Sequence, residues 1–213
     1  MFLKNFLHNR RKSMRVEIVN NAPNVRVTTS ENDGTVIITL SPEGCKALGE
    51  HEPGAIIKLG KREYIVLQHL SGVTAVIAKD FVKKMAFGKT GDYLNSDIRA
   101  YLNNDFYKEI AGAVGKENIV KHQTDLTADD GTGVKICEDY VSILTTERYR
   151  AYRKFLPAYG SWWYTATRVS ADVDGYARDV CCVNSNGVLN WSDCDNDNGG
   201  VRPFVVLKSS LLI

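Results

Sequence analysis

The sequence predicts an α+β fold, in which two helices stand between segments that are typical of β-strands. Apolar residues recur every four positions over residues 94–110, which is the spacing of one face of a helix. A second segment with core-facing aromatic spacing covers residues 142–156. Short runs rich in β-branched and aromatic residues precede the first helix and follow the second. Helices enclosed by strands in this order favour an α+β domain.

The chain length and the turn residues predict two parts. A chain of 213 residues suits one domain with an extension, or two small domains. Residues 15–40 contain short strand patterns, and the Asn-Asp-Gly sequence at 32–34 is a turn signal between two of them. The segment 41–54 is rich in Gly and Pro and is typical of a linker. We therefore expect a β-rich N-terminal leader over residues 1–49 and a second domain over residues 50–213.

The second domain opens with three predicted strands. Residues 55–82 form two successive hairpin patterns, with turn residues at 60–61 and 71–72. Residues 116–137 are polar, and we expect a loop there. Strand patterns return within residues 161–207, separated by polar stretches that are too long for tight turns.

Each predicted helix has recognisable ends. The first has two candidate N-caps, Asn95 and Ser96, whose side chains can accept a hydrogen bond from a backbone N–H of the first turn. The second can be capped by Thr145 or Thr146 and ends before Pro157.

Composition and charge exclude several classes of protein. The net charge of +2 is too small to indicate nucleic-acid binding, and the basic residues within 147–155 are expected to form the solvated face of a helix. No apolar run approaches the roughly 20 residues that span a bilayer. The first 14 residues lack the continuous apolar region and the cleavage site of a secretory signal. We expect synthesis in the cytoplasm without a signal peptide, and leave open incorporation into a virion or display by a partner.

The five cysteines do not predict a disulfide framework. Their odd number, the adjacent pair Cys181-Cys182 and the absence of a secretory signal all oppose one. No pair has the CxxC spacing of a structural zinc site. We expect free thiols, including the remaining three, Cys45, Cys137 and Cys194.

The polar segment near the C-terminus resembles a calcium loop only in part. Its alternate carboxylates are Asp193, Asp195 and Asp197. Asn198 occupies the position where an EF-hand needs Gly, and Phe204 occupies that of the bidentate Glu. A looser calcium site, with help from Asp172 and Asp174, stays an alternative. We expect no metal or other cofactor.

Nothing in the sequence indicates catalysis. None of the four histidines lies in the C-terminal polar segment with its cysteines, so a Cys–His nucleophile is not indicated. We expect His69 to pack within a strand and His122 to lie on a surface loop. The known signatures of serine hydrolases, zinc peptidases and phosphate-binding loops are missing. We therefore expect that the protein is not an enzyme.

The segment from Tyr164 to Asn198 has the composition of a binding surface. It combines many Asp, Asn, Ser, Thr and Tyr residues with isolated apolar residues at strand-like intervals. Trp, Tyr and Arg supply contact area at modest entropic cost, and Asn, Ser and Asp supply adaptable hydrogen bonds. An ordinary loop-rich surface is the alternative interpretation.

Motifs along residues 53–207 resemble those of a bacterial and phage domain family. The family's C-terminal signature is W-W-L-R-S, then a Y-A-x-x-V strand, an N-x-x-G turn and a closing G-V-R-P-a-L. The matching segments here are "GSWWYTATR", "YARDVCCVNSNGVLNW" and "GGVRPFVVL". Upstream, "GAIIKLGKREYIVLQHLSGVTAVIAKDFV" and "LNSDIRAYLNNDFYKEI" are similar to its opening hairpin and to its S-x-L-R-x-Y-L-N-x-x-F helix.

The resemblance implies a C-type-lectin-like fold, of the branch shared with formylglycine-generating enzymes. Several such proteins are variable proteins of diversity-generating retroelements, in which adenine-directed mutagenesis randomises codons of a C-terminal ligand-binding face. It implies recognition of a protein or glycan ligand on a host or neighbouring cell, as in a phage receptor-binding protein or an adhesin. The framework positions that match are Trp162, Trp163, Gly187, Gly199, Val201, Arg202 and Pro203. The candidate ligand-binding positions are Tyr164, Thr165, Thr167, Arg168, Ser170, Asp172, Asp174, Arg178, Asp179, Cys181, Cys182, Asn190, Trp191, Ser192, Asp193, Cys194 and Asp195.

The resemblance leaves alternatives open. Tyr164 and Thr165 replace the family's Leu and Arg, so either these two positions are diversified or the chain is a divergent member. The leader can dock the domain onto a larger assembly or form a homo-oligomer, and a virion structural protein is a second functional alternative. A metal-dependent lectin or an enzyme of the same fold is a third. The family's enzymes bind copper through paired cysteines, whereas adjacent Cys181 and Cys182 on a strand would point to opposite faces.

Overall fold

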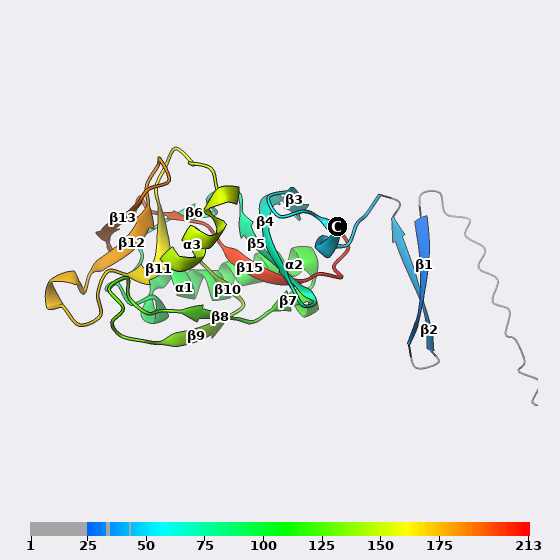
Figure 1. The fold of residues 1–213 in the computed structure, drawn as a ribbon, viewed down its shortest axis with the longest axis horizontal. Coiled ribbons are helices and arrows are strands. Elements are labelled where there is room, and N and C mark those ends of the chain that lie inside the picture. The colour runs from blue at the N-terminus through cyan, green and yellow to red at the C-terminus, as the bar shows by residue number, and fades with distance from the viewer. Residues whose placement is uncertain (1–24, 33–34, 43) are drawn as a thin grey trace, which may run out of the picture. The chain divides into compact units, whose positions relative to one another are not determined.

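The chain consists of two compact units, residues 1–45 and 46–213. The computed structural model describes residues 25–32, 35–42 and 44–213. Figure 1 gives the course of the chain within each unit.

The described residues of the first unit form an antiparallel hairpin. Strand β1 (Val25–Asn32) pairs along its whole length with β2 (Thr35–Pro42). The prediction of two strands on either side of the Asn-Asp-Gly turn signal is therefore confirmed. The strand expected at residues 15–19 lies outside the described residues.

The second unit begins slightly earlier than the expected domain start at residue 50. The backbone N–H of Leu48 donates to the carbonyl oxygen of Leu211 over 2.7 Å, and that of Gly49 donates to Ser209 over 2.9 Å. Residues 46–49, which the sequence assigned to the leader, thus pair with residues of the second unit.

A six-stranded sheet forms one half of the second unit, in the order β10-β15-β5-β4-β3, with β7 on β15 (Figure 1). The two hairpins predicted over residues 55–82 are confirmed, because β3, β4 and β5 pair antiparallel in succession. The strands are β3 (Ile56–Leu59), β4 (Arg62–Leu70), β5 (Val73–Ala78), β7 (Ile119–Val120), β10 (Val141–Ser142) and β15 (Phe204–Lys208).

A five-stranded sheet in the order β13-β12-β11-β14-β6 forms the other half. The short strand β14 pairs parallel with β11, and the chain then passes through residues 202–203 into β15 of the first sheet. One segment of nine residues, 200–208, therefore belongs to both sheets. The strands are β6 (Lys83–Lys84), β11 (Trp163–Arg168), β12 (Asp179–Val183), β13 (Leu189–Asp193) and β14 (Gly200–Val201).

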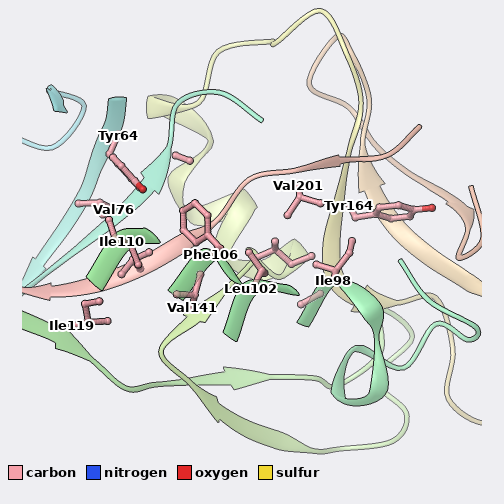
Figure 2. Packing of buried hydrophobic residues seen from close by; sticks show 14 of the residues in the cluster. Tyr64, Val76, Ile98, Leu102, Phe106, Ile110, Ile119, Val141, Tyr164 and Val201 are labelled. Carbon is pink, nitrogen blue, oxygen red and sulfur yellow. The ribbon is translucent and has the colours of Figure 1, made fainter. Parts of the chain in front are cut away.

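The first predicted helix is confirmed as α1 (Asp97–Tyr101), a π-helical segment (Leu102–Phe106) and α2 (Tyr107–Val114) in one continuous run. Ser96 is the N-cap, and its hydroxyl accepts a hydrogen bond from the Arg99 N–H over 3.1 Å. The residues at four-residue spacing face the core together with residues of both sheets (Figure 2). These buried helical residues are Ile98, Leu102, Phe106 and Ile110.

The second predicted helix is α3 (Thr146–Tyr152), and a 3-10 turn (Arg153–Phe155) follows it. Thr145 is its N-cap and accepts a hydrogen bond from the Arg148 N–H over 3.2 Å. Within the described residues, no helix is long and apolar enough to cross a membrane. Helices and antiparallel strands in this arrangement make the second unit an α+β domain.

The prediction of a loop over residues 116–137 is confirmed for residues 126–135 and is wrong on either side of them. After β7, strand β8 (His122–Asp125) pairs antiparallel with β9 (Ile136–Asp139). Burial alternates along both strands as in any half-buried hairpin. The alternation was invisible in the sequence because three of the four inward-facing side chains are polar, and the fourth is a cysteine. These are His122, Thr124, Cys137 and Asp139.

The prediction that His122 lies on the surface is also wrong. Its ring is 9% exposed, packs edge-on against Phe204 with centroids 5.0 Å apart, and hydrogen-bonds the Ser142 hydroxyl through Nε2 over 2.8 Å. Burial, followed by the nearby Arg148 guanidinium, lowers the pKa of His122 from 6.5 to about 4, against a weaker opposing effect of Asp139.

This burial predicts acid sensitivity. The folded protein binds the His122 proton less readily than the unfolded chain, so this contribution to stability is fully present above pH 6.5. It is lost as the pH falls from 6.5 towards 4, by about 3 kcal/mol in all. Urea unfolding at a series of pH values should show a steeper loss over this range in the wild type than in His122→Gln. Equal slopes for the two proteins would contradict the assignment.

Candidate functional site

The candidate site lies on the sheet formed by β11, β12 and β13 (Figure 1). In the register of β12 with the edge strand β13, Cys181 lies opposite Trp191 and Asp179 lies opposite Asp193. Directly paired residues share a face of a sheet, and so do residues two apart on one strand. These four residues therefore lie on one face, which we call the outer face.

The opposite face packs into the core through Tyr164. Its ring lies 5.4 Å from that of Phe87 and 5.0 Å from that of Trp162, measured between centroids. Its hydroxyl lies 2.6 Å from the carbonyl oxygen of Asp193 and 3.0 Å from that of Asn196, and can donate to either. Tyr164 thus holds the loop at residues 193–196 against the core. None of its surface is exposed, so it belongs to the scaffold.

Eight candidate positions are not displayed as expected, because the protein covers at least nine-tenths of each side chain. The structure satisfies several of these polar groups internally: the Thr165 hydroxyl donates to the Cys181 carbonyl over 2.7 Å. The family resemblance placed them on the ligand-binding face, but the sheet around them buries them. They are Tyr164, Thr165, Thr167, Ser170, Asp179, Cys181, Cys182 and Cys194.

The other candidates do reach the surface. Trp191 is 55% exposed, which is unusual for so large an apolar side chain. Arg178 hydrogen-bonds the Asp195 carboxylate and lies 3.6 Å from that of Asp193. Arg168 and Ser192 are half-buried. The exposed candidates are Asp172, Asp174, Arg178, Asn190, Trp191, Asp193 and Asp195.

The binding-site prediction did not include Asp129, which lines a cavity together with Cys181 and Trp191 of the outer face. Asp129 accepts hydrogen bonds from the Thr146 hydroxyl over 3.1 Å and from the Arg150 guanidinium over 3.2 Å. The backbone N–H of Thr146 donates to the Thr167 hydroxyl over 3.1 Å, which ties α3 to β11. Asp129 was missed because it lies in the segment expected to be a loop, far from β11 in sequence.

Two shallow cavities meet at Asp129 and Thr146. One has a volume of about 290 Å³ and the other, which reaches the outer face, about 240 Å³. The first is lined by Asp125, Thr127, Ala128, Asp129, Thr145, Thr146, Glu147, Arg150 and Thr167. The second is lined by Asp129, Thr146, Val169, Cys181, Leu189, Asn190 and Trp191.

The thiols of the site are buried and free. Burial raises the pKa of Cys181 to about 12 and that of Cys182 to about 11, so both are neutral at physiological pH and poor nucleophiles. Among the described residues, no three His, Cys, Asp or Glu side chains are grouped closely enough to hold a metal ion.

The segment that closes the sheet has no room for side chains at two glycines. A Cβ on Gly199 would overlap the Tyr164 ring, and a Cβ on Gly200 would lie 2.5 Å from the Phe81 ring. Gly187 adopts a φ of +80°, and its carbonyl accepts a hydrogen bond from the Tyr149 hydroxyl over 2.7 Å.

Comparison of the chain with protein-family models, with curated proteins and with solved structures gives no match.

The close approach at Gly199 predicts a selective loss of stability. Gly199→Ala should lower the free energy of unfolding by about 2 kcal/mol, because the added methyl group forces the Tyr164 ring out of its site. Gly112→Ala, within α2 and with open space around the added methyl group, should instead stabilise the protein by up to about 1 kcal/mol. Urea unfolding of both variants checks the pair, and equal effects would contradict the packing argument.

Proposed function

We propose that residues 46–213 form a ligand-recognition domain of the C-type-lectin-like type, and that the chain is a variable protein of a diversity-generating retroelement. The outer face of β12 and β13, with the adjoining cavity, is the ligand-binding surface. The ligand is a protein or a glycan on a host or neighbouring cell. The first unit attaches the domain to a larger assembly or to further copies of the chain.

The exposed indole of Trp191 carries this proposal. Tryptophan is among the residues most enriched at binding hot spots, because it buries a large area for the loss of few rotatable bonds. Here it lies on a strand whose backbone is held by the ladder to β12, beside a cavity of about 240 Å³. A rigid support for an exposed aromatic side chain reduces the entropy that binding would otherwise cost.

The distribution of burial also supports the proposal. The positions that match the family framework include the fully or almost fully buried Trp163, Val201 and Arg202. The exposed candidates lie on β13 and on two loops, at residues 172–178 and 193–195. Substitution at these exposed positions would leave the core unchanged, which is what a diversified surface requires. Tyr164 and Thr165, by contrast, are buried and would belong to a divergent framework.

Sequencing of the locus across the source population tests the proposal. We expect a nearby reverse transcriptase and a template repeat. Substitutions should fall where the template repeat reads adenine, within the codons for exposed residues such as Trp191, Asp193 and Asp195. The codons for Trp163 and Arg202 should be constant. If the codons for exposed residues are as constant as the codons for buried residues, diversification is contradicted, and one fixed ligand or an assembly contact is favoured.

A further inference from the structure

We infer that the outer face binds a positively charged side chain, lysine or arginine, of a basic peptide segment. The cation would rest on the Trp191 indole and face the carboxylates of Asp179 and Asp193, which lie opposite each other across β12 and β13. This inference rests on the proposed function, because it names the ligand chemistry of the same surface.

The first observation is an uncompensated carboxylate on the outer face. Asp179 is 9% exposed, and its side chain makes no hydrogen bond or ion pair with any other described residue. Its oxygens nevertheless keep contact with solvent, since they are not among the sealed and unpaired polar atoms of the described chain. A carboxylate that is partly desolvated and has no hydrogen-bond partner is less favourable than one in water, and a bound cation would relieve that cost.

The second observation is a like-charge pair across the strands. Asp179 and Asp193 lie directly opposite each other in the β12–β13 ladder, an arrangement that destabilises a sheet. The Nε atom of Arg178 lies 3.6 Å from the Asp193 carboxylate, and the same guanidinium also donates a hydrogen bond to the Asp195 carboxylate. Burial, and then the charge of Asp193, raise the pKa of Asp179 above its ordinary value. The surface is therefore short of positive charge at this point.

The third observation is the cavity beside these residues. Cys181, two residues from Asp179 on the same face, and Trp191, opposite Cys181, both line it, together with Asp129. In the adjoining cavity Asp125, Asp129 and Glu147 provide three carboxylates against two cations, Arg150 in its lining and Arg148 close to Asp125 and Glu147. A negative concave surface attracts cationic ligands and speeds their association.

The indole supplies the matching recognition element. A lysine or arginine over the face of a tryptophan gains about 0.5–2 kcal/mol, depending on how far it is desolvated. No Lys or Arg of the described residues lies over the Trp191 ring, although eight such contacts occur elsewhere in the domain. An exposed indole that adjoins carboxylates suits an organic cation better than a hard metal ion, which takes oxygen ligands alone.

The charge also favours a peptide over a neutral glycan. A sugar can stack on tryptophan, but its hydroxyl groups cannot neutralise the Asp179–Asp193 pair. A lysine or arginine side chain does both, because its aliphatic part packs on the ring while its charged end faces the carboxylates.

The test uses the full chain labelled with ¹⁵N and the peptide acetyl-Gly-Ser-Arg-Ser-Arg-Ser-Gly-amide. We expect the indole N–H signal of Trp191, assigned with Trp191→Phe, to shift on titration, with an affinity that weakens as salt is added. Asp179→Asn and Trp191→Ala should each weaken binding by about three- to tenfold, measured for Trp191→Ala through the backbone amide signals of β12 and β13. Asp105→Asn, which removes an exposed carboxylate from the long helix, should change it by less than twofold.

A second readout separates a binding role from a structural one. Because Asp179 is unpaired in the free protein, Asp179→Asn should raise the melting temperature while it weakens peptide binding. A variant that loses both stability and binding would assign Asp179 to the scaffold and overturn the inference.

The remaining outcomes are also decisive. A titration with calcium alone or with maltotriose that shifts the Trp191 signal, while the peptide does not, would overturn the inference in favour of a metal ion or a glycan. If the codons for the exposed residues vary across the population but the peptide does not bind, the inference fails and the proposed function stands. If the codons are constant and the peptide binds, the proposed diversification fails and the cation site stands.

Discussion

Both sheets depend on the contacts of the buried Arg202 guanidinium. It lies between β14 and β15, is 2% exposed, and stacks near the rings of Trp163 and Tyr159, 5.1 and 5.6 Å from their centroids. Its Nε donates to the carbonyl oxygen of Ala78 over 3.1 Å, and the Ala78 N–H donates to Pro203 over 2.8 Å. Burial lowers the pKa of Arg202 to about 10, so the group is still charged at neutral pH and is stabilised by the two aromatic faces.

The contacts of Arg202 hold the outer face in place, although Arg202 is not part of that face. Arg202 joins the end of β5 to β11 through Trp163, and Gly200 donates from its N–H to the carbonyl oxygen of Trp162 over 3.1 Å. The absence of side chains at Gly199 and Gly200 lets the chain pass close beneath aromatic rings. The strand β11 is thereby held on one side by the closing segment and on the other by β12, whose edge neighbour carries Trp191.

Scaffold and surface are thus divided within a short stretch of chain. The buried hydroxyls of Thr165 and Thr167 hydrogen-bond backbone groups of β12 and α3, and the thiols of β12 are buried, whereas charged residues gather on β13 and on the loop before β12. The second-unit core extends under this surface from the helix over residues 97–114 (Figure 2). A well-supported surface can carry an unfavourable carboxylate pair, because the rest of the domain supplies the stability that the pair removes.

The sequence by itself determined the α+β class, the two helices with their caps and the strands on either side, because four-residue periodicity, Ser96, Thr145 and the turn residues are local signals. It also marked Trp191 and the acidic segment after it. Only the tertiary structure decided that β8 and β9 form a hairpin, since three of their four inward residues are polar and leave no apolar alternation in the sequence. Thr165 and Cys181, which the family resemblance placed on the binding face, are buried by the sheet around them. Asp129 joins the site through contacts with α3 and through the hydrogen bond from its backbone N–H to the Arg168 carbonyl of β11, and no local pattern encodes either.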